Sequence, residues 1–336
     1  MISSTVDSNK ISALKQAFTR GGTFFLLGHK EPDGDCIGSL TALYYLLKNH
    51  SKKVEMAVYE EIPLQYQLAA EEIEKNIILY EEDIDFSAYD AVITVDCSDL
   101  DRTGPASENL SSVINSSEDT TVINIDHHDD NSHFGHLNLV NPQAAATGEI
   151  LYDLALQWQW EISLSAARSL AMAILADTGF FRYSNTTIEV MEKVIELMNK
   201  GVNIYKINRS LYGRKQPKIL KLKGRALASL QMAARDNIAY LQITREDYKS
   251  TDTVPQDKEG IVNYARDVDG VEVGILFSEE EDGIKVSFRS NDYLQVNEIA
   301  KKFGGGGHHR AAGCKVDGDL QQVIDDVILE VKKNVF

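Results

Sequence analysis

The 336-residue sequence has few cysteines, no long apolar run and fewer basic than acidic residues, and each shortage excludes a class of protein. Its three cysteines, Cys36, Cys97 and Cys314, are odd in number and show no Cys-x-x-Cys spacing, which excludes a complete disulfide framework and favours free thiols in a reducing compartment. No apolar stretch approaches the roughly 20 residues of a membrane-spanning helix. Residues 1–10 also lack the apolar run of a signal peptide. We therefore expect a cytoplasmic protein with no membrane partner.

Basic residues are scarce as well: 34 lysines and arginines face 51 aspartates and glutamates, and the formal net charge is −17. A strongly acidic protein repels long nucleic acid unless positive charge is concentrated locally. Such a concentration lies between Glu196 and Asp236, a stretch without an acidic residue. Its basic residues are Lys200, Lys206, Arg209, Arg214, Lys215, Lys218, Lys221, Lys223, Arg225 and Arg235. Any one of them is explained by a solvated helix face, but together they favour a surface that faces an anionic ligand.

In the first half of the chain, buried-strand patterns alternate with amphipathic-helix patterns. Short apolar runs predict strands at 23–27, 54–59, 91–95 and 122–125. Apolar residues at helical spacing predict a helix from residue 36 onward and helices at 149–160, 165–175 and 188–199. This alternation predicts an α/β fold, a mostly parallel sheet with helices on both faces. In such sheets, ligands bind at the carboxyl ends of the strands.

The remainder predicts a smaller α+β domain across a cleft from the first. Strands are expected near 238–243, 271–277 and 284–288, and helices at 296–302 and 320–331. The basic stretch between the two domains has the apolar spacing of a helix and predicts a connector. We therefore expect domains over 1–200 and 236–336, joined by a basic helical connector over 201–235.

Aspartate and histidine side chains gather where four of these elements end. His29, Asp33 and Asp35 follow the first strand, where Pro32 and Gly34 force a turn. The other candidates follow two further strands and one helix: Asp96, the triplet Asp126, His127 and His128, and Asp177. A single aspartate here would be a cap and a single histidine structural. Together on one sheet edge, however, these groups would repel each other unless cations lay among them.

This mixture of carboxylates and imidazoles predicts two divalent metal ions. It suits Mn²⁺ best, with Mg²⁺ or Fe²⁺ as alternatives, and the lack of cysteine ligands disfavours structural zinc. Cys36 and Cys97 adjoin candidate ligands but are better explained as small buried residues. Two cations about 3.5–4 Å apart would activate a shared water as hydroxide and hold the attacking and leaving oxygens of a phosphoester. The sequence therefore predicts a site for two divalent metal ions that can activate water.

Two motifs carry a resemblance to a known family. The triplet Asp126-His127-His128 resembles the signature of the DHH phosphoesterase superfamily. The run Phe303-Gly-Gly-Gly-Gly-His308-His-Arg-Ala-Ala-Gly313 resembles the Gly-Gly-Gly-His-x-x-Ala-(Ala/Ser)-Gly signature of the C-terminal domain that accompanies it. The resemblance covers nearly the whole chain, and its length and arrangement are similar to those of the nano-RNase and pAp phosphatase group.

The resemblance implies a role for each candidate residue. One metal would be held by His29, Asp33 and Asp96, and the other by Asp35, Asp96, His127 and Asp177, so that Asp96 bridges the two ions. His128 would orient the scissile phosphate or the leaving group, and Asp126 would support a histidine of the triplet. The second domain would hold a terminal phosphate through Arg289, Ser290, Gly305, Gly306, Gly307 and His308. An arginine fork and glycine amides suit that task because both can approach an anion closely.

As a function, the resemblance implies hydrolysis of oligoribonucleotides a few nucleotides long to 5′-mononucleotides, and dephosphorylation of 3′-phosphoadenosine 5′-phosphate (pAp) to AMP. Long nucleic acid would not be a partner, and a homodimer stays open. Two alternatives also stay open: a phosphodiesterase for cyclic-di-AMP or linear pApA, and a catalytically silent nucleotide-binding module. The full ligand set disfavours the silent module. RecJ-type exonucleases carry additional domains for which the chain has little room, and family II pyrophosphatases lack the Gly-Gly-Gly-Gly-His segment.

Overall fold

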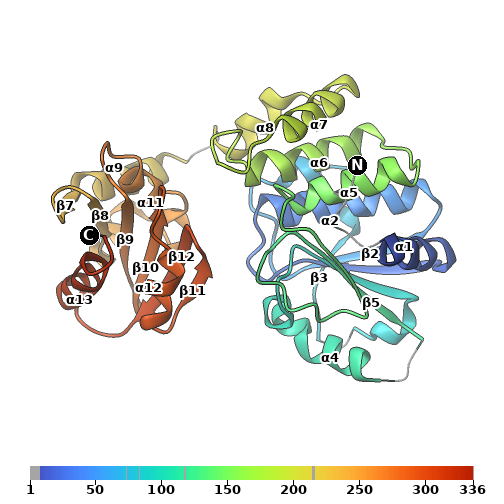
Figure 1. Cartoon of the computed structure of the whole chain (residues 1–336), viewed down its shortest axis with the longest axis horizontal. Coiled ribbons are helices and arrows are strands. Elements are labelled where there is room, and N and C mark those ends of the chain that lie inside the picture. Colours follow the sequence, from blue (N-terminus) through green and yellow to red (C-terminus); the bar gives the residue numbers. More distant parts are fainter. Residues whose placement is uncertain (1–7, 73, 83, 117–118, 214–215, 336) are drawn as a thin grey trace. The chain divides into compact units, whose positions relative to one another are not determined.

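The computed structural model describes residues 8–335 apart from 73, 83, 117–118 and 214–215. The chain divides into two compact units, Met1–Arg214 and Lys215–Phe336, each with its own sheet and core (Figure 1). None of the described helices combines the length and apolar character that crossing a bilayer requires.

The first unit is built on a six-stranded parallel sheet with the strand order β3-β2-β1-β4-β5-β6. Its strands are β1 (Thr23–Leu27), β2 (Lys53–Val58), β3 (Ile77–Leu79), β4 (Ala91–Val95), β5 (Thr121–Asp126) and β6 (Leu137–Val140). Its helices are α1 (Ser8–Arg20), α2 (Gly34–Asn49), α3 (Gln67–Ala70), α4 (Ser107–Asn115), α5 (Thr147–Gln157), α6 (Leu164–Asp177), α7 (Ile188–Asn199) and α8 (Ile204–Leu211). The 3₁₀ turns η1 (Glu74–Asn76), η2 (Phe86–Ala88) and η3 (Leu100–Ala106) complete this unit.

Both faces of this sheet are covered, as the continuous apolar strands predict. Phe24 and Leu26 of β1 point into the larger core under α2, α5 and α6. Phe25 and Leu27, the alternate residues of the same strand, point into a second core against η2 and α4. The two layers of helices lie on opposite sides of the sheet in Figure 1. The predicted α/β architecture is therefore confirmed.

The second unit contains a mixed sheet with the order β11-β12-β10-β9-β8-β7, in which only the pair of β8 and β9 is parallel. Its strands are β7 (Gln231–Ala233), β8 (Ile238–Ile243), β9 (Val273–Glu280), β10 (Gly283–Ser290), β11 (Gly306–His308) and β12 (Ala311–Val316). Its helical elements are α9 (Pro217–Ala228), α10 (Arg245–Thr251), η4 (Pro255–Lys258), α11 (Val262–Arg266), α12 (Val296–Lys302) and α13 (Leu320–Lys332). One core lies under α12 and α13, and another lies under α9 and α11.

The structure divides the stretch 201–235, which the sequence predicts to be a connector, between the two units. Ile207 and Leu211 of α8 are buried in the larger core of the first unit. Leu222 and Ala226 of α9 are buried in a core of the second unit. Each helix is therefore held by its own apolar face, and the stretch contains two helices that belong to different units.

Some basic residues of this stretch form ion pairs that the sequence does not suggest. The amine of Lys218 lies 4.0 Å from a carboxylate oxygen of Asp257, and the guanidinium of Arg225 lies 3.5 Å from Asp247. Both aspartates come from later in the chain, so a count within the stretch cannot reveal them. Arg214 and Lys215 lie outside the described residues.

Candidate active site

The candidate ligands converge at the point where the order of the parallel sheet reverses. Strands β1 and β4 are neighbours there, and their connections leave in opposite directions along the sheet. The crevice at the carboxyl ends of such a strand pair is where open α/β sheets bind ligands. His29 follows β1 and Asp96 follows β4 directly. Asp96 has a left-handed φ of 60°, a backbone strain that is typical of functional positions.

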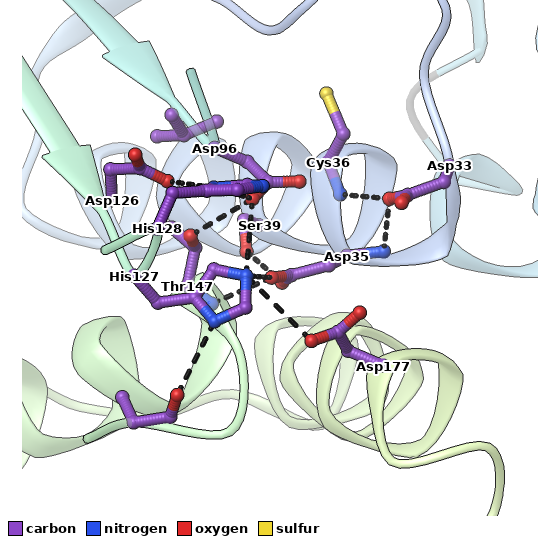
Figure 2. Close-up of polar contacts among 12 residues, drawn as sticks. Asp33, Asp35, Cys36, Ser39, Asp96, Asp126, His127, His128, Thr147 and Asp177 are labelled. Carbon is purple, nitrogen blue, oxygen red and sulfur yellow. Dashed lines mark hydrogen bonds and ion pairs between the residues drawn. The ribbon is translucent and has the colours of Figure 1, made fainter. Parts of the chain in front are cut away.

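The histidines and carboxylates form one partly buried cluster, and Figure 2 shows its aspartates together with His127 and His128. The Nε2 atom of His127 lies 3.7 Å from a carboxylate oxygen of each of three aspartates: Asp35, Asp96 and Asp177. The Nε2 atom of His29 and the Nδ1 atom of His128 each lie 3.6 Å from an oxygen of Asp96. Asp96 therefore has three histidine neighbours, which is the central position that a bridging ligand would require.

These separations fit ligands around a shared cation better than hydrogen bonds. Hydrogen bonds between nitrogen and oxygen usually measure about 2.7–3.2 Å. Two ligand atoms that each bind one ion at about 2.1 Å, at coordination angles of about 90–120°, lie about 3.0–3.6 Å apart. Within the described residues, three groups of ligand atoms lie within 4.8 Å of one another: Asp96, His127 and His128; Asp35, His127 and Asp177; and His29, Cys36 and Asp96.

The charges of the cluster lead to the same conclusion. Burial, together with the negative charge of Asp96, raises the pKa of Asp35 well above its ordinary value. Burial likewise raises the pKa of Asp177 to about 7. Burial opposes the charging of His127, but the carboxylates of Asp177, Asp35 and Asp96 outweigh it and raise its pKa to about 10. A site that retains protons so strongly is one in which divalent cations would supply the missing positive charge. The residues present therefore fit divalent metal ions.

Cys36 is a geometric neighbour of His29 and Asp96 that the sequence predicts to be only a small buried residue. Burial raises the pKa of its thiol well above the ordinary value, and the charge of Asp96 adds to this effect. Because the thiolate, not the thiol, binds metals, this environment disfavours Cys36 as a ligand. A side chain on Gly28 would place its Cβ 2.2 Å from the Cys36 sulfur, so the thiol also fills space against the end of β1.

Asp33 and Asp35 are positioned by the start of α2. The Oδ1 atom of Asp33 caps this helix by accepting hydrogen bonds from the amides of Asp35 and Cys36, at 2.9 and 3.0 Å. The next turn supplies Ser39, whose hydroxyl donates to Asp35 at 2.9 Å. Asp33 belongs to none of the three groups of ligand atoms found among the described residues. The structure thus shows Asp33 as a helix cap beside the cluster, and its predicted ligand role stays a prediction.

The two histidines of the triplet have different contacts. Asp126 accepts a hydrogen bond from Nδ1 of His128 at 2.7 Å, and its other oxygen accepts one from Asn131 at 2.6 Å. Burial opposes the charging of His128, but this hydrogen bond outweighs it and raises the pKa of His128 above its ordinary value. Asp126 is fully buried and makes its contacts with His128 rather than with His127. It therefore contacts one histidine of the triplet, and Asn131 is a partner that the sequence did not reveal.

The segment 144–148, which leads into α5, was missed by sequence reasoning. The amides of Thr147 and Gly148 donate to the two oxygens of Asp35 at 2.6 and 3.0 Å. The Thr147 hydroxyl lies 3.3 Å from Asp96. Asp35 thus satisfies the first amides of a helix whose own N-cap, Ala146, provides no side-chain hydrogen bond.

The same segment reaches the other two central ligands. The carbonyl of Ala144 lies 3.3 Å from Nδ1 of His127, which directs the other ring nitrogen of His127 toward the carboxylates. The side-chain amide of Asn185 donates to the carbonyls of Ala145 and Asp177, both at 3.2 Å. Segment 144–148 therefore contacts Asp35, Asp96 and His127 directly and is tied to Asp177 through Asn185.

In the second unit, the predicted phosphate-binding residues meet at one end of the sheet. Arg289 pairs with Ala311 in the register of β10 and β12, and Ala311 pairs with His308 of β11. Ser290 is buried, and its hydroxyl has no hydrogen-bond partner among the described residues. The amide of Ser290 donates to the carbonyl of Arg310 at 3.1 Å, which joins the end of β10 to the turn that follows β11.

The glycine run is divided between a turn and a strand. Gly304 lies in the turn after α12, Gly306 and Gly307 belong to the edge strand β11, and residues 309–310 form the turn between β11 and β12. A Cβ on Gly305 would lie 2.1 Å from the carbonyl oxygen of Gly313, and Gly307 has a φ of +133°. The close contact at Gly305 and the backbone conformation at Gly307 therefore each require glycine, independently of any ligand. The side chain of His308 lies outside the described part of the structure.

Comparisons with known proteins agree with this fold and this cluster. Residues 23–176 match the DHH family, N-terminal domain, and residues 236–334 match the DHHA1 domain. A relative from Thermus thermophilus, named bifunctional oligoribonuclease and PAP phosphatase NrnA, is 32% identical over 94% of this chain and 90% of its own length. The chain therefore belongs to the DHH family of phosphoesterases.

Further relatives agree with this assignment. The protein of the same name from Bacillus subtilis is 24% identical over 88% of this chain and 89% of its own length. The solved structure of an exopolyphosphatase-related protein from Bacteroides fragilis superposes with a TM-score of 0.91 at 26% identity, covering 99% of both chains. RecJ from Thermus thermophilus, solved in complex with Mn²⁺, shares the fold at 13% identity with a TM-score of 0.56, covering 97% of this chain and 54% of RecJ.

Proposed function

We propose that the protein hydrolyses short oligoribonucleotides to 5′-mononucleotides and removes the 3′-phosphate of pAp. The observation that carries this proposal is the cluster around Asp96, in which three histidines and two further aspartates surround one strand end. The names of the relatives from Thermus thermophilus and Bacillus subtilis, each an oligoribonuclease and PAP phosphatase, support the choice of substrates.

The proposed cofactors are two divalent ions, with Mn²⁺ as the best fit to a mixed set of carboxylates and imidazoles. His29, Asp33 and Asp96 would hold one ion, and Asp35, Asp96, His127 and Asp177 the other. When bound, two such ions lower the pKa of a water molecule and neutralise negative charge on the scissile phosphate. Three members of the second set, Asp35, His127 and Asp177, offer ligand atoms within 4.8 Å of one another, which supports that part of the assignment most directly.

His128 would act on the substrate. Asp126 holds its Nδ1 atom at 2.7 Å and so fixes the direction of its Nε2 atom. The raised pKa of His128 favours the protonated ring, which donates a hydrogen bond to a phosphate oxygen or to the leaving oxygen. Asp126 does not transfer the proton in this scheme; it orients the ring and stabilises its charge.

In the second unit, Arg289 and Ser290 would bind a terminal phosphate of the substrate. The buried Ser290 hydroxyl supports this role because such a group usually has a partner, and a phosphate oxygen would provide one. The amide of Gly305 already donates to the carbonyl of Ala300 at 2.9 Å, so Gly305 would contribute by its shape, while the backbone amides of Gly306, Gly307 and His308 would add donors to the same anion. A short substrate with a terminal phosphate fits this role, whereas added length gains nothing on a protein with a net charge of −17.

The test offers four substrates side by side to the purified protein with MnCl₂: pAp, a 5′-phosphorylated dinucleotide, a cyclic dinucleotide and a long RNA strand. We expect the highest kcat/KM for pAp and the dinucleotide. Preference for the cyclic dinucleotide would replace the proposed substrate with that class. Equal rates on the dinucleotide and the long strand would contradict the role of the terminal phosphate. No hydrolysis of any of the four would refute the proposal.

A further inference from the structure

A largely buried lysine with two carboxylate partners lies next to segment 144–148 and takes no part in the chemistry described above. The amine of Lys193, on α7, lies 2.6 Å from Oε1 of Glu149 and 2.9 Å from a carboxylate oxygen of Asp153, both on α5. The three side chains are only 14%, 9% and 7% exposed. Charges so far removed from water are costly, so a functional reason for their position is worth seeking.

Glu149 uses its second oxygen to shape the backbone of the site. Its Oε2 atom accepts a hydrogen bond from the amide of Ala145 at 2.7 Å, which folds the segment 144–148 back onto the first turn of α5. The same carboxylate therefore joins Lys193 on α7 to the segment that contacts the candidate ligands. Lys193 fixes the carboxylate, and the carboxylate fixes the segment.

The segment holds two of the candidate ligands, Asp35 and His127. The amides of Thr147 and Gly148 hold both oxygens of Asp35, so a rotation of this turn would rotate that carboxylate. The carbonyl of Ala144 likewise sets the ring of His127. Without the cation of Lys193, the carboxylates of Glu149 and Asp153 would repel each other, and Glu149 would turn away from the Ala145 amide.

We propose that Glu149 and Lys193 are positioning residues that set the affinity of the site for divalent metal ions. This inference rests on the proposed function, since it takes the metal ligands from there. In this proposal, an ion pair between α5 and α7 maintains the geometry of the ligand set, although neither Glu149 nor Lys193 touches metal or substrate.

The experiment measures the affinity for Mn²⁺ directly, in the full-length protein and without substrate. MnCl₂ is titrated into metal-free protein, and the free ion is followed by electron paramagnetic resonance. Lys193→Met should weaken binding about 10-fold, the lower end of the effect of removing a direct partner of metal ligands, because Lys193 acts through Glu149 and the segment. Lys193→Arg, which keeps the charge, should restore most of the affinity. Lys258→Met is the matched control, because it breaks an ion pair of the same 2.6 Å length and similar burial, with Glu280 in the second unit.

Each outcome decides the inference. Unchanged Mn²⁺ affinity in Lys193→Met would overturn it, even if the variant melts at a lower temperature, because the pair would then be merely structural. If Lys193→Met does not fold, Glu149→Gln replaces it: glutamine can still accept from the Ala145 amide but lacks the charge that Lys193 requires. Unchanged affinity in that variant would equally overturn the inference. A wild-type protein that binds no Mn²⁺ would overturn the proposed function as well, which distinguishes the two failures.

Discussion

Metal binding to this protein should release protons, and the number can be worked out from the cluster. Without metal at pH 7, His127 is almost fully protonated because its pKa is about 10, and Asp177 is half protonated because its pKa is about 7. Both must lose their protons to act as ligands. The two residues together should therefore release about 1.5 protons per protein at pH 7, and Asp35, whose pKa is also raised, adds to this number.

Calorimetric titration of MnCl₂ in buffers of different ionisation enthalpy counts these protons. The same number gives the slope of affinity with pH, so the affinity should rise about 30-fold per pH unit near pH 7. His127→Gln should bind more weakly and release about one proton fewer. His133→Asn is the control, because His133 lies outside the cluster and asparagine tolerates its left-handed backbone. Binding without proton release, or a release that does not depend on His127, would refute the assignment of His127 as a metal ligand.

Three further predictions follow from the same contacts. Asp96→Asn, which keeps the left-handed backbone, should lower kcat/KM by at least about 100-fold and reduce the bound metal measured by mass spectrometry. Its control, Asp99→Ala, should keep the activity and lose only the helix cap to the Arg102 amide, which lowers the free energy of unfolding by about 1 kcal/mol. Arg289→Ala should raise KM for a 5′-phosphorylated dinucleotide about 10- to 100-fold while a small generic phosphodiester is cleaved as before, and equal effects on both would contradict phosphate binding. The melting temperature of the metal-free protein should fall as pH rises from about 4 to 10, because Asp177 and His127 hold protons more tightly in the folded protein than in the unfolded chain. A rise of the melting temperature in this range would contradict the raised pKa values.

The sequence was sufficient where a single strand or helix carries the signal. Strands β1 and β4 and helix α7 have the bounds that their apolar patterns predict, since these elements are buried or strongly amphipathic. The edge strand β3 was not predicted because Ile78 and Leu79 are exposed and the run is only three residues long. Strand β11 was hidden for a different reason: its glycines have low strand propensity, and pairing with β12 determines its conformation.

The candidate ligands could be selected from the sequence because aspartates and histidines that follow predicted strands can be recognised there, and most of them lie together in the structure. The residues that support them could not. Ala144 and Ala145 contribute through their backbone, where residue type carries no signal. Lys193 reaches Glu149 from 44 residues away, and only the packing of α7 beside α5 brings the two together. In the same way, Asp247 and Asp257 neutralise parts of a basic stretch that contains no acid of its own.

The cap that Asp35 provides to helix α5 has a consequence for the order of events in biosynthesis. The two partners are 112 residues apart, and the last ligand, Asp177, emerges later still. In zinc fingers, closely spaced ligands let the metal drive folding of the nascent segment. Here no short segment contains a complete ligand set, and closing such long loops before the sheet exists would be entropically costly. The ion therefore cannot nucleate this domain: the apolar core must assemble first, and the finished protein then acquires its metal.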